Sequence, residues 1–271
     1  FARILRVESD KIGFTSDFTI YDEADSRSLL KSIVKEMGLS EKTYKPAVVH
    51  ARISMAKNQL IGVDSYESDS DILSQNKRAG MPEIAKIYRE YVQRCKLANA
   101  MDFDDLLVYT YRLFVERNDV LKKYGKIFKY IMVDEYQDTN GAQYQLTSLL
   151  AGMYRNLCVV GDADQSIYGW RGADIRNIMD FEKDYPEATV IKLEQNYRST
   201  KTILNAANMV IEHNLDRKPK KLWTNNPQGE KIIHYTASDE RDEARFITEE
   251  AVKQKTLFNV SYLSLIHISE P

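Results

Sequence analysis

Three short apolar runs, each ending abruptly in polar residues, constrain the fold of this 271-residue chain most strongly. The runs occupy residues 130–133, 157–160 and 189–193, and helical patterns at residues 143–150 and 175–185 separate them. Strands of four or five residues that alternate with helices predict βαβ units and a parallel sheet. Ligands of such sheets bind at the carboxyl ends of the strands. The polar residues that follow the runs are therefore predicted to form a ligand-binding edge.

Residues 26–121 have a different, strongly charged and helical pattern. Apolar residues recur at three- and four-residue spacing in residues 29–37 and 84–92. Residues 102–107 open another helix, with carboxylates where a helix N-terminus favours them. The polar stretch 62–82 is predicted to hold a loop. Two domains fit a chain of this length.

The region after the third run is less regular. It combines a helical pattern at residues 200–213, a basic stretch at residues 217–221 and a possible strand at residues 231–235. The formal net charge is −2, so no global basic field indicates nucleic acid, and any such binding must use a local face. The basic stretch is a candidate face, and a solvated loop is the alternative interpretation.

The two cysteines, Cys95 and Cys158, lie far apart and have no metal-ligand neighbour at a useful spacing. This pattern predicts reduced structural thiols in a cytosolic protein. No apolar run approaches the ~18–20 residues that a membrane span requires. We therefore expect a cytoplasmic protein without a membrane partner.

The strongest local signal is VDEYQDT at residues 133–139. Asp134, at the end of a predicted buried strand, can hold Mg²⁺ beside nucleotide phosphates. The adjacent Glu135 can orient or deprotonate an attacking water molecule. A bare Asp-Glu pair more often belongs to a solvated acidic loop, but seven residues in this order favour the catalytic interpretation.

The second signal is VGDADQSIYGWRGA at residues 160–173. The neutral side chain of Gln165 both donates and accepts hydrogen bonds, so it can sense a γ-phosphate or its water molecule. Trp170 stands in a polar, glycine-flanked loop, where base stacking is one use for a large aromatic ring. The alternative is that Trp170 plugs the loop onto its own domain.

The third signal is LEQNYRST at residues 193–200. Arg198 offers a planar fork that suits phosphate oxygens, and Tyr197 beside it can stack on a nucleobase. A Tyr-Arg pair alone carries little information. Its position after the third apolar run is what makes it a candidate.

In this order and spacing, the three blocks resemble superfamily 1 helicases of the UvrD/PcrA/Rep group, and most of all its PcrA branch. The resemblance extends from Phe1 to about Ala244, and residues 101–107 are similar to the DFDDL segment of that group. It implies an α/β fold: part of a RecA-like parallel-sheet P-loop NTPase core domain, an inserted all-helical domain and the start of a second core domain. The implied boundaries are residues 1–20 for the end of the first part of core domain 1A, 21–116 for helical domain 1B, 117–192 for the remainder of 1A and 193–258 for the start of 2A.

The resemblance also implies an ATP-dependent 3′–5′ DNA helicase that uses ATP and Mg²⁺. Its implied partners are single-stranded DNA, 3′-tailed duplex DNA and the N- and C-terminal parts of the same helicase. The implied roles are Mg²⁺ binding for Asp134, water activation for Glu135, coupling of nucleotide state to DNA for Gln165, adenine stacking for Tyr197, γ-phosphate contact for Arg198, and DNA contact for Tyr168, Trp170 and Arg171.

The sequence departs from the group in one important respect. No G-x-x-x-x-G-K-[ST] pattern occurs, and Gly125-Lys126 lacks both the earlier glycine and the Ser/Thr. We therefore expect an internal fragment that is inactive alone, with residues 259–271 as a foreign or disordered tail. Two alternatives stay open: an ATP-independent module that binds single-stranded DNA or a partner through Trp170 and residues 217–221, and a carboxylate-metal nuclease that uses Asp134, Glu135 and Asp138.

Overall fold

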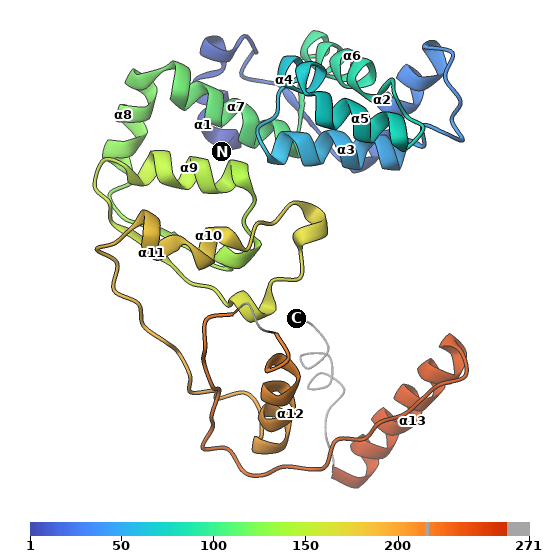
Figure 1. The fold of residues 1–271 in the computed structure, drawn as a ribbon, viewed down its shortest axis with the longest axis vertical. Helices are drawn as coiled ribbons and strands as arrows, with labels where there is room; N and C mark the ends of the chain where they lie inside the picture. The colour runs from blue at the N-terminus through green and yellow to red at the C-terminus, as the bar shows by residue number, and fades with distance from the viewer. Residues whose placement is uncertain (215–216, 259–271) are drawn as a thin grey trace. The chain divides into compact units, whose positions relative to one another are not determined.

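The computed structural model describes residues 1–214 and 217–258 of the chain. Their contacts form two compact units, one of residues 1–190 with 217–218 and the other of residues 191–214 with 219–258. Helices and short parallel strands build the larger unit, as expected for an α/β protein (Figure 1). The tail predicted at residues 259–271 lies outside the described residues.

A group of helices follows the first strand and forms an insert in the larger unit (Figure 1). They are α2 (Glu23–Glu36), α3 (Pro46–Asn58), α4 (Val63–Ser68), α5 (Ser70–Arg78) and α6 (Ile84–Leu97). Asp22 starts α2 with a reciprocal capping box, and Pro46 fits the first turn of α3.

The stretch 62–82 holds a loop at residues 79–82, between α5 and α6, as predicted, but most of it forms α4 and α5. Asp69 accepts hydrogen bonds from two backbone N–H groups at the start of α5. The buried Asn76 amide donates to the Tyr66 hydroxyl oxygen at 3.0 Å, and Tyr66 is itself buried. A cap and a satisfied buried polar pair thus stabilise helices that the polar sequence does not reveal.

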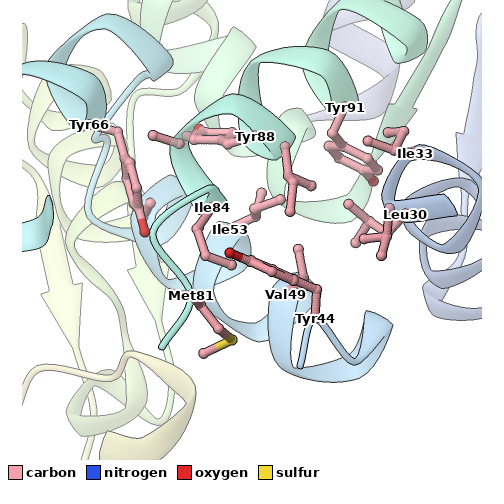
Figure 2. Close-up of a cluster of buried hydrophobic side chains, with 14 of the residues drawn as sticks. Leu30, Ile33, Tyr44, Val49, Ile53, Tyr66, Met81, Ile84, Tyr88 and Tyr91 are labelled. Atoms are coloured by element: carbon pink, nitrogen blue, oxygen red, sulfur yellow. The ribbon is translucent and has the colours of Figure 1, made fainter. Parts of the chain in front are cut away.

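The insert has its own apolar core, shown in Figure 2. Side chains from α2, α3 and α6 meet there, and Leu30, Val49 and Ile87 are fully buried. The rings of Tyr66 and Tyr88 pack edge to face with centroids 5.6 Å apart. Such burial stabilises by roughly 1.5–3 kcal/mol per large apolar side chain.

A buried ionic network lies at the base of this insert. The Lys57 amine of α3 lies 2.6 Å from an Asp102 carboxylate oxygen and 2.8 Å from one of Asp105. The Tyr91 hydroxyl also donates to Asp102, at 2.9 Å. Burial opposes the charge of Lys57, but the two carboxylates outweigh it and hold the pKa of its amine well above the usual value.

A second apolar cluster joins the residues that precede the insert to residues that follow it. It brings together side chains such as Leu5, Phe114 and Leu146. The elements around it are α1 (Ala2–Val7), η1 (Ser9–Ile12), β1 (Thr19–Tyr21), β2 (Ala100–Asp102), α7 (Phe103–Glu116), α8 (Asn118–Ile127) and α9 (Gly141–Ala151). Strand β1 pairs in parallel with β2. The domain boundary at residue 116 stays a prediction, and α7 contributes to this cluster through Leu113 and Phe114.

The two strands that precede the acidic motifs are confirmed. Strand β3 (Ile131–Val133) pairs in parallel with β4 (Leu157–Val159), and Met132 lies opposite Cys158. On one face, Val133 and neighbouring side chains pack against a small cluster around Tyr136. On the other face, Met132 and Cys158 are exposed.

The third predicted strand, at residues 189–193, is absent from the described structure, and its apolar side chains are exposed. A strand needs the N–H and C=O groups of a neighbour, and β3 and β4 pair only with each other among the described residues. The helix predicted at residues 175–185 divides into α10 (Arg176–Met179) and α11 (Phe181–Asp184). The break allows Asn177 to reach Thr139 while Phe181 packs on Tyr136.

The smaller unit contains α12 (Lys201–Ile211), which confirms the helix predicted there, and α13 (Glu240–Phe258). Residues 231–235 do not form the predicted strand, and Ile232 and Ile233 are exposed. Across residues 1–214 and 217–258, no helix combines the length and the apolar character needed to cross a membrane.

Candidate functional site

The acidic pair Asp134 and Glu135 follows β3 directly and is exposed. The Glu135 backbone is left-handed, with φ 48° and ψ 43°, and its N–H donates to Asp134 Oδ1 at 2.9 Å. This conformation is uncommon for a residue other than glycine. The reversal presents both carboxylates to solvent at the carboxyl end of the strand.

Tyr136 anchors the acidic loop on the inside. It is fully buried, and its ring packs edge to face on Phe181 with centroids 5.7 Å apart. Its N–H donates to the Val160 carbonyl oxygen at 3.0 Å, so the loop is also tied to the end of β4. Burial raises the pKa of the Tyr136 hydroxyl, which is therefore neutral and serves as packing.

Gln137, in the short helix η2 (Tyr136–Asp138), connects the two loops at this edge of the sheet. Its side chain is buried, and its amide nitrogen donates to Glu135 Oε2 at 2.8 Å and to Asp138 Oδ2 at 3.2 Å. Its amide oxygen accepts the Asp162 N–H at 2.9 Å. Gln137 was not predicted as a site residue, although it lies inside the motif at residues 133–139. The signal available was a neutral donor-acceptor side chain within an otherwise acidic run.

The loop after β4 carries Gln165, at the end of η3 (Ala163–Gln165). Asp162 organises this loop, because its carboxylate accepts from the Asp164 N–H at 2.9 Å and from Gln165 Nε2 at 2.8 Å. Gly161 permits the close approach of the two loops, since a Cβ atom there would lie 2.6 Å from Gln137 Oε1. The structure thus brings the loops of Glu135 and Gln165 together through a chain of hydrogen bonds.

Two cations of the basic stretch at residues 217–221 form ion pairs. Arg217 lies 2.8 Å from an Asp164 carboxylate oxygen, and both side chains are largely buried. Lys218 pairs with Glu182 at 2.5 Å on the surface. These contacts place two of its cations against carboxylates, which weakens the interpretation of this stretch as a DNA-binding face.

The Trp170 loop contains η4 (Gly169–Arg171), and the Trp170 side chain is not buried against its own domain. Trp170 is 69% exposed, and the Arg171 guanidinium carbon lies 4.6 Å from its ring centroid and 5.5 Å from that of Tyr168. A cation beside aromatic faces suits contact with stacked bases and phosphates. Gly172, with φ 92°, turns the loop next to the Asn58 side chain of α3.

The Trp170 loop is also fastened to the segment that follows the acidic loop. Asn140 starts α9 with a capping box and forms an isolated bridge with Ala173. The Asp174 N–H donates to the Thr139 carbonyl oxygen at 2.9 Å. The Asn140 amide nitrogen donates to Asn58 Oδ1 at 2.8 Å within the protein interior. Hydrogen bonds therefore connect the Trp170 loop to Thr139 and Asn140, which directly follow the acidic loop.

Tyr197 and Arg198 belong to the smaller unit, where both are exposed. Asn196 Oδ1 accepts the N–H groups of Arg198 and Ser199, at 3.0 and 2.7 Å. The Asn226 amide donates to the Tyr197 carbonyl oxygen at 3.0 Å. The loop backbone is thus fixed while the two candidate side chains are exposed, just before α12.

The residues after β3 fit a magnesium ion held together with phosphate oxygens. Mg²⁺ prefers carboxylate oxygens and usually takes only one or two of them from the protein. Asp134 is exposed, and Asp138 Oδ1 is buried without a hydrogen-bond partner in the described structure. No group of three or more His, Cys, Asp or Glu residues within the described ranges has the arrangement of a metal site.

Comparison with known proteins identifies the family. The description "UvrD/REP helicase N-terminal domain" matches residues 2–186, and "UvrD-like helicase C-terminal domain" matches residues 191–267. This chain belongs to the UvrD/REP helicase family. It is 51% identical to the ATP-dependent DNA helicase PcrA of Staphylococcus aureus (strain Mu50) over 254 residues, and 50% identical to PcrA of Staphylococcus epidermidis (strain ATCC 12228). Each match covers 93% of this chain and 34% of the relative, so the chain spans about a third of the length of these curated relatives.

Proposed function

We propose that this chain supplies part of the ATP- and DNA-contacting machinery of an ATP-dependent 3′–5′ DNA helicase of the PcrA branch. One observation carries the proposal: the Gln137 amide joins the loops that follow β3 and β4. The loop after β4 also carries the exposed Trp170. The relatives that are about half identical to the chain are named ATP-dependent DNA helicases. A DNA substrate and free cysteines at positions 95 and 158 favour a cytoplasmic location.

The proposed chemistry is ATP hydrolysis. Asp134 would hold Mg²⁺, which supplies charge neutralisation for the phosphates. Glu135 would orient and deprotonate the attacking water molecule, and Gln165 would sense the γ-phosphate. Arg198 would contact phosphate oxygens through its planar fork, and Tyr197, 77% exposed, would stack on the adenine.

The proposed DNA contact is formed by Trp170, Tyr168 and Arg171. Stacking does not depend on base identity, because every base has a π-face. The relatives' name supports DNA as the polymer, and we infer single-stranded DNA and 3′-tailed duplexes as substrates. ATP turnover would then change the loop after β4, which carries both Gln165 and the tryptophan segment.

The rate of ATP hydrolysis tests the proposed role of this chain in nucleotide chemistry. Because the sequence contains no G-x-x-x-x-G-K-[ST] loop, we would use a chimera in which residues 2–258 replace the matching segment of Staphylococcus aureus PcrA. Glu135→Gln should lower kcat for DNA-stimulated ATP hydrolysis by ~10²–10⁴-fold while nucleotide binding persists. The matched control is Glu41→Gln, an exposed carboxylate of the insert. An undiminished kcat would remove Glu135 from its role.

DNA binding tests the other half, on the 271-residue chain itself. Trp170→Ala should weaken binding to oligo-dT and to mixed sequence equally, by ~1–3 kcal/mol. The melting temperature should not change, because the ring is exposed. Trp223→Ala, which removes the other tryptophan, is the control. Unchanged affinity on both oligonucleotides would disprove the DNA contact.

A second candidate function is an ATP-independent module that binds single-stranded DNA. The exposed Trp170 beside Arg171, on a chain with no phosphate-binding loop sequence, favours it for the isolated chain. We expect that chain to bind DNA with an affinity that ATP and Mg²⁺ do not alter, and to turn over no ATP. DNA-stimulated hydrolysis above that of Glu135→Gln would exclude this candidate.

A further inference from the structure

We infer that Gln137 is a positioning residue: its side-chain amide holds the Glu135 carboxylate and ties it to the loop that carries Gln165. The inference deepens the proposed function and rests on Glu135 as the water-activating residue. It assigns a separate task to each end of one buried amide.

The nitrogen end of the amide holds the acidic loop. It donates to Glu135 Oε2 at 2.8 Å and to Asp138 Oδ2 at 3.2 Å. Glu135 is otherwise exposed, and its backbone is left-handed. A side chain in that setting samples several rotamers, and a hydrogen bond from a buried, fixed donor selects one of them.

The oxygen end holds the neighbouring loop. Gln137 Oε1 accepts the Asp162 N–H at 2.9 Å, and the Asp162 carboxylate in turn accepts from Gln165 Nε2 at 2.8 Å. The Gln137 main-chain oxygen also accepts from the Ser166 hydroxyl at 3.3 Å. Three hydrogen bonds in series therefore connect the Glu135 carboxylate to the Gln165 amide.

The surroundings fix this amide in place. Gln137 is 1% exposed, and Gly161 leaves the space that its oxygen occupies, since a Cβ atom would approach to 2.6 Å. The chemistry also requires an amide. A carboxylate in this position could accept from Asp162 but could not donate to Glu135, and an apolar side chain could do neither.

Two near-isosteric variants separate the two ends. Gln137→Glu keeps the acceptor and loses the donor, whereas Gln137→Met loses both. In the chimera with Staphylococcus aureus PcrA, both should lower kcat by about 10²-fold, the loss expected when a reacting group is misplaced by about 1 Å. The KM for ATP and the affinity for single-stranded DNA should stay at the parent value, a separation that general loss of structure would not give. Gln145→Glu and Gln145→Met, at an exposed glutamine of α9, are the matched controls.

Amide hydrogen exchange on the 271-residue chain provides an independent measurement. Exchange over residues 161–165 should remain at the parent rate in Gln137→Glu and become faster in Gln137→Met. Parent-like kcat in Gln137→Glu, or parent-like exchange in Gln137→Met, would overturn the inference. Retained turnover in Glu135→Gln would instead refute the proposed function, and the exchange data would still report whether Gln137 ties the two loops.

Discussion

The helical insert and the β3–β4 sheet belong to the same compact unit, yet they bury their apolar residues very differently. In the insert, Leu30 and Ile84 are inaccessible to solvent and lie in a core among its helices (Figure 2). In the sheet, Met132 is 78% exposed and its register partner Cys158 is also exposed. Parallel strands are normally covered on both faces, and here the described residues cover one.

The candidate chemistry lies in the less buried of these two regions. Apolar packing stabilises the insert, whereas the loops that leave the sheet are held by the buried Tyr136 and by hydrogen bonds in which Gln137 and Asn140 donate and Asp162 accepts. Such loops open at lower free energy than a packed core does. The geometry of the candidate site therefore depends on a few polar contacts, whereas apolar burial is concentrated in the helical insert.

The largest effect on stability should come from disrupting the buried ion pairs of Lys57 with Asp102 and Asp105. Lys57→Met leaves Asp102 and Asp105 buried without their cation, which should lower the free energy of unfolding by ~3–5 kcal/mol. Urea denaturation followed by circular dichroism measures this loss. The triple variant Lys57→Met, Asp102→Asn, Asp105→Asn should recover part of it. A single variant as stable as the parent would show that the insert does not depend on this network.

The next effect compares the two regions directly. Ile87→Ala in the closed core should cost ~2–5 kcal/mol, because it removes buried apolar contacts and leaves a cavity. Met132→Ala on the open face should change stability by no more than ~0.5 kcal/mol. Denaturation midpoints of the two variants give the comparison. Equal losses would mean that the outer face of the sheet is covered in solution.

The smallest effect concerns the basic stretch. Lys218→Ala removes an exposed ion pair with Glu182, so stability should fall by no more than ~1 kcal/mol. The affinity for single-stranded DNA, measured by fluorescence anisotropy, should not change, because this cation already faces a carboxylate. A clear loss of affinity that high salt abolishes would restore the stretch as a DNA-binding face.

Much of the fold followed from periodicity in the sequence. The runs that became β3 and β4 and the pattern that became α12 were predicted, because each combines an apolar period with clear boundaries. The helices α4 and α5 were not predicted, because few apolar residues stand in their polar sequence, although Ile72 and Leu73 of α5 pack against the core of the insert and Asp69 caps α5. The run at residues 189–193 carries a strand-like composition, but pairing is a tertiary property that composition does not contain.

The geometry of the candidate site was less predictable than the fold. Motif order placed Glu135 and Gln165 on successive loops of one sheet edge, and the structure joins those loops. The connecting residue, Gln137, was not predicted, because burial and hydrogen-bond direction depend on both loops at once. The roles of Tyr197 and Arg198 stay predictions, as do those of Trp170 and its neighbours.

The left-handed backbone at Glu135 has a consequence for protein engineering. A glycine there would adopt φ 48° freely, whereas a residue with a Cβ atom stores roughly 1–3 kcal/mol of strain. Glu135→Gly should therefore favour the folded state, apart from the hydrogen bond it removes, while deleting the carboxylate on which the proposed reaction depends. Screening a library of variants for heat resistance alone would favour variants in which this glutamate has been replaced. Screens on this family should therefore select for turnover at the same time.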